Sequence, residues 1–112
     1  MGIDMFIGEE QVRLTNSYYY NEFLNWVAMM GEYPSILDHS PIHGYYSHNE
    51  DEEIGEYTGQ IKLLKKEVEE LITFKPPPHV DWVLRRILEA IRISEENNTT
   101  ITMDDGAWEG ET

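Results

Sequence analysis

The chain has 112 residues, of which 40% are hydrophobic and 27% are charged, and its formal net charge at pH 7 is −14. This length predicts one compact domain over residues 1–112, with enough apolar residues for a buried core. No apolar run approaches the roughly 18 residues that indicate a membrane-spanning helix. Cysteine is absent, which excludes disulfides and a cysteine nucleophile and favours a cytoplasmic location.

The negative charge is distributed unevenly along the chain. Residues 1–61 carry eleven acidic side chains and a single basic one, Arg13, for a net charge of −10, whereas residues 62–112 have a net charge of −4. Such a field repels nucleic acids and anionic membranes and attracts basic partners. Solubility is the commonest reason for an acidic composition, but solubility does not require one half of a chain to be almost free of cations.

A β-hairpin followed by a helix is predicted for the first thirty residues. Residues 3–7 alternate in the manner of a half-buried strand, and residues 12–15 follow as the returning strand. Asn16 is able to cap a helix over 18–30, in which apolar side chains recur at spacings of three and four residues. Gly31 is a natural end for this helix.

A long connection rich in histidine, tyrosine and acidic residues is predicted at 38–56. A packed core gains little from such a run, because most of its polar groups prefer water. Long ordered loops are more often functional than short ones, so this loop is the first place to look for a site. A third strand over 56–61 and a second helix over 62–74 follow.

The last third of the chain predicts one more helix, one more strand and a tail. Three prolines at 76–78 form a stiff connector, and a strong apolar stripe predicts a helix over 80–97. The β-branched segment 99–103 is typical of a strand. We expect a turn at Asp104 and an acidic tail over 104–112.

The predicted order of elements is β-β-α-β-α-α-β. Because strands and helices do not alternate strictly, this order argues against a doubly wound parallel sheet. It favours an α+β fold, in which a small, mostly antiparallel sheet of about four strands has three helices packed on one face.

The histidines of the long loop suggest a metal site. An aspartate and three histidines offer oxygen and imidazole ligands: Asp38, His39, His43 and His48. His39 and His43 have the spacing of a helical pair, but Pro41 between them argues against a helix. Solvated histidines in a loop are the alternative interpretation, and no cofactor is predicted.

No catalytic motif is present in the sequence. Asp38, His39 and Ser40 are neighbours in the chain, and neighbouring residues cannot form a triad, which requires groups from different elements. The sequence contains no nucleophile elbow, phosphate-binding loop, dinucleotide fingerprint or two-histidine zinc helix. It therefore favours a binding protein over an enzyme.

Aromatic residues suggest a nucleotide pocket as an alternative. Aromatic rings stack on bases, provided that cations lie close enough to hold the phosphates. The nearest set of cations is on the last predicted helix, so the alternative ligand-binding residues are Tyr19, Trp26, Arg85 and Arg86. Most of the aromatic side chains are expected to lie in the core.

The acidic run at 50–56 is the leading candidate for a contact surface. Carboxylates at phosphate-like density pair with the lysines and arginines of a nucleic-acid channel, and adjacent tyrosines supply the aromatic anchors that protein interfaces favour. The predicted partner-binding residues are Glu50, Asp51, Glu52, Glu53, Glu56, Tyr45 and Tyr46. The competing interpretation is a solvated loop.

In its length, its charge, its lack of cysteine and its 50–56 run, the chain resembles the small acidic phage-encoded counter-defence proteins, of which anti-CRISPR inhibitors of the DNA-mimic type are examples. The resemblance is one of class, and it carries over no residue by position. It implies an inhibitor in the host-cell cytoplasm that binds a basic, nucleic-acid-binding protein and does not bind nucleic acid itself. Oligomeric sponges for nucleotide second messengers are similar too, and imply a homo-oligomer whose arginines and tyrosines converge.

Overall fold

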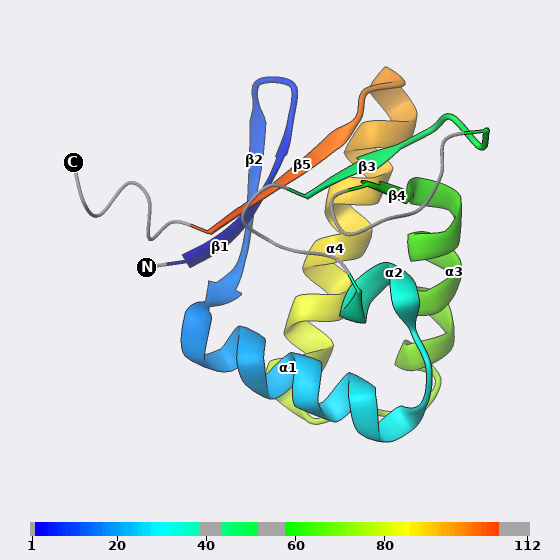
Figure 1. Ribbon diagram of the computed structural model, residues 1–112. Helices are drawn as coiled ribbons and strands as arrows, with labels where there is room; N and C mark the ends of the chain where they lie inside the picture. Colours follow the sequence, from blue (N-terminus) through cyan, green and yellow to red (C-terminus); the bar gives the residue numbers. More distant parts are fainter. Residues whose placement is uncertain (1, 39–43, 52–57, 106–112) are drawn as a thin grey trace.

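A computed structural model describes residues 2–38, 44–51 and 58–105 and shows an α+β fold (Figure 1). Within these ranges the elements run β1 (Gly2–Ile7), β2 (Glu10–Asn16), α1 (Ser17–Met30), α2 (Pro34–Leu37), β3 (Tyr45–Ser47), β4 (Thr58–Gln60), α3 (Ile61–Ile72), α4 (Pro78–Asn97) and β5 (Ile101–Asp105). No helix in these ranges combines the length and the apolar character that a bilayer crossing requires.

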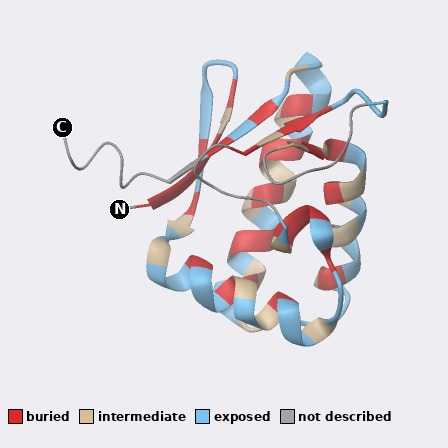
Figure 2. Ribbon diagram, in the orientation of Figure 1, coloured by how far each residue is buried: buried red, intermediate tan, exposed pale blue. Residues whose placement is uncertain are grey.

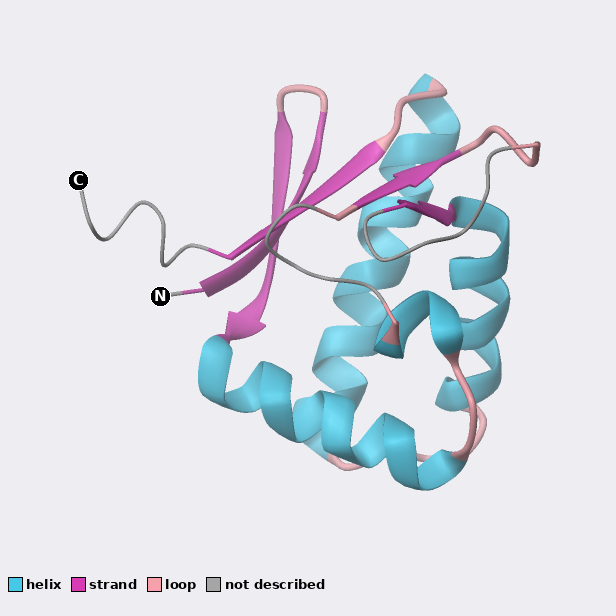
Figure 3. Ribbon diagram, viewed as in Figure 1, coloured by secondary structure: helices cyan, strands magenta, loops and turns pink. Residues whose placement is uncertain are grey.

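The strands form one mixed sheet in the order β2-β1-β5-β3-β4. The pairs β1–β2, β1–β5 and β3–β5 are antiparallel, and β3 pairs with β4 in parallel. The three substantial helices, α1, α3 and α4, pack against this sheet, with α4 running along it and α1 crossing one end (Figure 3). The predicted α+β class and mostly antiparallel sheet are therefore confirmed.

The helices lie close to their predicted positions because their signals are local. Asn16 caps α1, since its side-chain oxygen accepts a hydrogen bond of 2.8 Å from the backbone N–H of Tyr19. Helix α4 is followed by its C-cap Asn98, whose φ of 49° and ψ of 48° lie in the left-handed region that often closes helices. The tight turn between β1 and β2 uses Gly8, with a φ of 62°.

The strand predictions need two corrections. The sheet has five strands, because Tyr45–Ser47 form β3 inside the segment predicted as a loop. The last strand extends to Asp105, so Asp104 and Asp105 belong to β5 and not to a turn and tail. Both differences have one cause: β3 and the end of β5 exist through pairing with distant strands, which short-range patterns do not reveal.

One core joins the sheet to the helices, as the buried residues in Figure 2 show. Ile3, Met5 and Ile7 contribute the inner face of β1, and all three are almost fully buried. The apolar faces of α3 and α4 complete the cluster with Leu64, Val68, Leu71, Val83, Leu84 and Ile87. Burial does not alternate along β1 as the predicted half-buried strand requires, because Gly2 and Asp4 are buried as well and Phe6 is half-buried. The helical spacing on α3 and α4 is the pattern expected for helices with one buried face.

A β-bulge at Leu14 ties the edge strand β2 to α4. Ile3 pairs with Thr15 and Asp4 pairs with Arg13, so Leu14 is an extra residue on β2. The indole N–H of Trp82 donates to the Leu14 carbonyl at 2.8 Å. One residue earlier, the Arg13 carbonyl accepts a 2.9 Å hydrogen bond from the Nε of Arg86 on α4.

A buried polar hub at Ser35 joins three elements. The hydroxyl of Tyr46 on β3 donates to the Ser35 carbonyl at 2.6 Å, and the Ser35 N–H donates to Oε2 of Glu67 on α3 at 3.1 Å. Burial raises the pKa of Tyr46 well above its ordinary value, and burial also raises the pKa of Glu67. The other Glu67 oxygen is buried without a hydrogen-bond partner among the described residues.

Replacing Glu67→Gln is expected to stabilise the fold at neutral pH. The amide keeps an acceptor for the Ser35 N–H and removes a half-buried charge. The folded-state pKa of Glu67 is raised, so in the wild type the charged carboxylate destabilises the fold by its full amount at neutral pH. This destabilisation disappears as the pH falls through the folded-state pKa toward the unfolded value of about 4.3. The difference in the free energy of unfolding between the variant and the wild type, measured in urea, should therefore decrease as the pH is lowered.

The exposed Glu69 on the same helix provides the control for this experiment. Glu69→Gln removes the same charge without relieving a buried one, so its stability relative to the wild type should change little over that pH range. A Glu67→Gln variant that is less stable than the wild type at neutral pH would contradict the expectation.

Candidate functional site

Residues Ser47–Asp51, which we call the anchored turn, begin at the last residue of β3 and present two acidic side chains. The N–H of Asn49 donates to the Ser47 hydroxyl at 2.9 Å, and the N–H of Asp51 donates to the Asn49 side chain at 3.0 Å. The side-chain amide of Gln60 holds the Glu50 carbonyl at 2.9 Å. The backbone is thus fixed by side chains from the turn itself and from β4, while Glu50 and Asp51 remain exposed.

His48 fastens the same turn to the C-terminal end of α4. Its Nε2 lies 2.8 Å from the hydroxyl oxygen of Ser94, and that hydroxyl donates to the Thr99 carbonyl. The Ser94 hydroxyl thus links the imidazole of His48 to the backbone that follows α4. Ser94 is fully buried, so this pair fixes structure and does not present a nucleophile.

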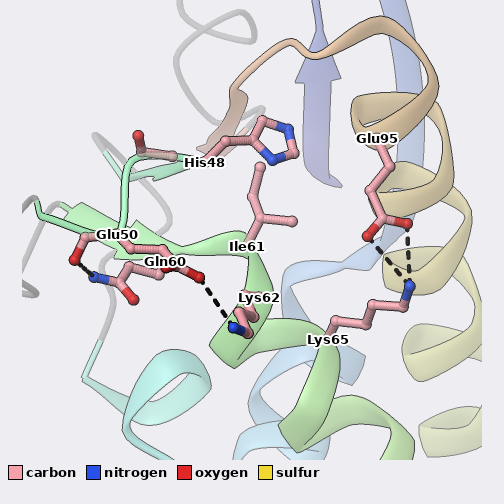
Figure 4. Close-up of a pocket in the computed structure, with 8 residues that line it drawn as sticks. His48, Glu50, Gln60, Ile61, Lys62, Lys65 and Glu95 are labelled. Atoms are coloured by element: carbon pink, nitrogen blue, oxygen red, sulfur yellow. Dashed lines mark hydrogen bonds and ion pairs between the residues drawn. The ribbon is translucent and has the colours of Figure 1, made fainter.

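A pocket of about 360 Å³ lies between the anchored turn and the start of α3 (Figure 4). An ion pair stands on each side of it: Lys62 lies 3.1 Å from Glu50, and Lys65 lies 3.1 Å from Glu95. The side chains of the first pair are 79% and 62% exposed, so the pair adds little stability and is free to exchange partners. The pocket therefore has a carboxylate on two opposite walls.

The only cation of residues 1–61 is already engaged. Arg13 on β2 forms an ion pair with Asp4 on β1, and the Asp4 side chain is almost fully buried. The Arg13 guanidinium also lies over Gly2, where it would collide with an added Cβ. This arginine therefore compensates a buried carboxylate of the sheet, and the excess negative charge of this half of the chain persists.

The structure brings together part of the predicted partner-binding set. Glu50 and Asp51 are exposed on the anchored turn, and Tyr45 is half-buried on β3. Glu52, Glu53 and Glu56 lie outside the described residues.

The interpretation of Tyr46 as a surface anchor is wrong. Its side chain is only 2% exposed, and its hydroxyl is bonded to Ser35 inside the hub. The physical reason is the alternation of β3, which turns Tyr46 to the core while the neighbouring Tyr45 remains half-buried.

The predicted metal ligands are only partly described. His39 and His43 lie outside the described residues, Asp38 is exposed at the end of α2, and His48 is bonded to Ser94. In the part of the chain that the structure describes, no group of three or more acidic or histidine side chains is placed to hold a metal ion. A metal site that uses the two remaining histidines stays a prediction.

The alternative ligand-binding residues lie at different places. Arg85 and Arg86 border a shallow hollow of about 410 Å³ together with Trp82, whose ring centroid is 5.5 Å from the Arg86 guanidinium. Tyr19 is exposed and contacts His79, with ring centroids 5.9 Å apart. Trp26 is half-buried and packs against the core. The arginines therefore share a hollow with Trp82 and not with the aromatic residues chosen from the sequence.

Several residues that build the site carry weak sequence signals. The Asn49-Glu50-Asp51 order is typical of a turn in which an asparagine side chain accepts the N–H two residues later, so this part was recognisable. Ser94 is 46 positions away from His48, and no local pattern connects them. Gln60 likewise reaches the turn only because β4 lies beside β3.

Comparison of the chain with protein-family models, with curated proteins and with solved structures gave no match.

Ser94→Ala should weaken the attachment of the anchored turn. The change removes the bond to His48 and the bond to the Thr99 carbonyl at a fully buried position. We expect a loss of about 1–3 kcal/mol in the free energy of unfolding, measured in urea. Glu95→Ala, next to it in an exposed ion pair with Lys65, should cost less than about 1 kcal/mol. Equal losses in the two variants would show that Ser94 is not an attachment point.

Proposed function

We propose that this protein is a non-enzymatic acidic inhibitor that acts in the cytoplasm by binding a basic, nucleic-acid-binding protein such as a defence nuclease. In this proposal the anchored turn enters the partner's nucleic-acid channel and presents carboxylates where the channel holds phosphates. The observation that carries the proposal is the anchoring itself: hydrogen bonds fix the backbone of Glu50 and Asp51, while both side chains are exposed.

Fixing the turn before binding matters because association costs conformational entropy. A loop that is already held in one conformation loses less freedom when a partner binds, so more of the contact energy appears as affinity. Gln60 donates a hydrogen bond to the Glu50 carbonyl, and Asn49 accepts one from the Asp51 N–H. Together with the contact of His48 with Ser94, these bonds supply the preorganisation. A loop whose only role is to be soluble gains nothing from such anchoring.

The pocket beside the turn suits a basic side chain of the partner. An arginine that enters it meets Glu50 on one wall and Glu95 on the other, where Lys62 and Lys65 are bound in the free protein. Arginine forms two parallel hydrogen bonds with a carboxylate, which lysine cannot do. Exchange of Lys62 for a partner's arginine therefore favours binding. The acidic run continues in sequence with Glu52, Glu53 and Glu56.

Two other functions remain predictions with less support. A sponge for a nucleotide second messenger requires cations and aromatic rings at one place, and Tyr19 and Trp26 do not line the hollow that contains Arg85 and Arg86. A metal-binding function depends on His39 and His43, which lie outside the described residues.

Reversing the charge of the anchored turn should abolish partner binding. The partner is first identified as a protein that this chain captures from a host lysate at low salt and releases at high salt. Release at high salt is expected because salt screens contacts between exposed charges. The double variant Glu50→Lys and Asp51→Lys should then bind this purified partner at least about tenfold more weakly. The matched control, Glu22→Lys and Glu69→Lys, changes the net charge equally at exposed positions on α1 and α3 and should retain binding. If both variants lost the same affinity for the partner, the effect would come from net charge and not from the anchored turn.

Removing the lysine that competes for Glu50 should strengthen binding. Lys62→Met deletes the ammonium 3.1 Å from the Glu50 carboxylate, so a basic group of the partner no longer has to displace it. We expect several-fold tighter binding and a free energy of unfolding within about 1 kcal/mol of the wild type. Lys66→Met makes the same charge change at an exposed position that does not line the pocket, and should have a smaller effect on affinity. Identical gains in both variants would exclude a specific role for Lys62.

A further inference from the structure

One side of α4 carries a stripe of six residues that range from half-buried to exposed. The residues recur at alternating spacings of three and four, which places them on one side of the helix. None of them is fully buried. We call this set the outer stripe of α4: His79, Trp82, Arg86, Glu89, Ile93 and Glu96.

The side chains around the start of the outer stripe have the composition of a protein interface. Trp82 is 57% exposed and Tyr18 is 66% exposed, which is unusual for such large rings. The rings of Tyr18 and Tyr19 are 5.2 Å apart, and Tyr19 contacts His79, so the aromatic surface continues onto α1. Tryptophan, tyrosine and arginine are the residues enriched at the centres of interfaces.

The outer stripe is complementary to itself. If two copies of α4 lie antiparallel about a two-fold axis between residues 87 and 88, Trp82 of one copy faces Ile93 of the other. In the same register Arg86 faces Glu89, and His79 faces Glu96. Every pair occurs twice, as the symmetry of such a dimer requires, and every pair is either apolar with apolar or basic with acidic.

Charge also favours this face over the rest of the surface. Two molecules of net charge −14 repel each other, so they approach most easily where the local charge is balanced. Along α4, three arginines lie among four acidic side chains, and one of these, Glu95, is paired with Lys65 of α3, so the local charge is close to balanced. Arg92 bonds to Glu89 at 2.6 Å and to Glu96 at 2.9 Å, and this bonding lowers the pKa of Glu89. Such exposed pairs are weak enough to rearrange in an interface.

We propose that the protein forms a symmetric dimer in which the outer stripe of α4 packs against the same stripe of a second copy. Arg86 uses its Nε for the Arg13 carbonyl, and the other N–H groups of its guanidinium are donors suited to Glu89 of the second copy. The proposal does not rest on the anchored turn, because Glu50 and Asp51 are not part of this face.

Charge exchange at one pair tests the dimer, with sedimentation velocity over a range of concentrations as the measurement. Arg86→Glu alone places two carboxylates opposite each other, and Glu89→Arg alone places two guanidinium groups opposite each other. Because like charges opposite each other weaken an interface strongly, each single variant should raise the dimer dissociation constant by at least about tenfold. The double variant restores opposite charges and should recover dimerisation.

Mixing the two single variants gives the decisive result. An equal mixture of Arg86→Glu and Glu89→Arg pairs carboxylates only with guanidinium groups, so it should form heterodimers although neither variant associates alone. Glu89→Arg leaves the bond between Arg86 and the Arg13 carbonyl intact, so it stays informative if Arg86→Glu is unstable in thermal unfolding.

Three outcomes would overturn the proposal. They are a wild type that remains monomeric into the millimolar range, single variants that dimerise as the wild type does, and a mixture that yields no heterodimer. A monomeric wild type whose tryptophan fluorescence responds to a cyclic dinucleotide would instead assign the hollow at Trp82 to a small ligand. None of these results bears on binding by Glu50 and Asp51.

Discussion

The position of the anchored turn depends on the hydrogen bond between the Tyr46 hydroxyl and the Ser35 carbonyl. This bond lies inside the molecule, where an unpaired hydroxyl or carbonyl costs more than the bond gains. It fixes the short strand β3 relative to α2, and the Glu67 carboxylate fixes α2 relative to α3 through the Ser35 N–H. Because the turn begins at the end of β3, a polar contact in the core determines where the acidic side chains reach the surface.

The helices and the first hairpin were predictable because each has a complete local pattern. Apolar residues at spacings of three and four, a capping Asn16 and the prolines before α4 act within a few positions of the chain. Strand β3 has no such pattern. Its three residues are held by pairing with β5 and with β4, and by a hydroxyl contact eleven positions away. The local sequence therefore indicates a loop here, because the pairing and the hydroxyl contact that stabilise the strand come from distant residues.

The same distinction separates the predicted and unpredicted parts of the site. Composition identified Glu50 and Asp51, since acidic residues without neighbouring cations are visible in any sequence. The fold determines which neighbours support them: Gln60 from β4 and Ser94 from α4. Tyr45 and Tyr46 are adjacent and chemically identical, yet one is half-buried and the other lies in the core. Their difference in burial comes from the alternation of β3, a strand that the local sequence pattern does not indicate.

The bulge at Leu14 has a consequence for how this sheet meets other chains. Strand β2 lies at the edge of the sheet, and edge strands offer unpaired carbonyls to any extended segment nearby. Here the carbonyls of Arg13 and Leu14 already accept hydrogen bonds from Arg86 and Trp82 of α4. A foreign strand would have to displace a guanidinium and an indole to continue the ladder at this point. These two contacts therefore protect the β2 edge of the sheet from pairing with a strand of another molecule, which is the usual first step of amyloid-like aggregation.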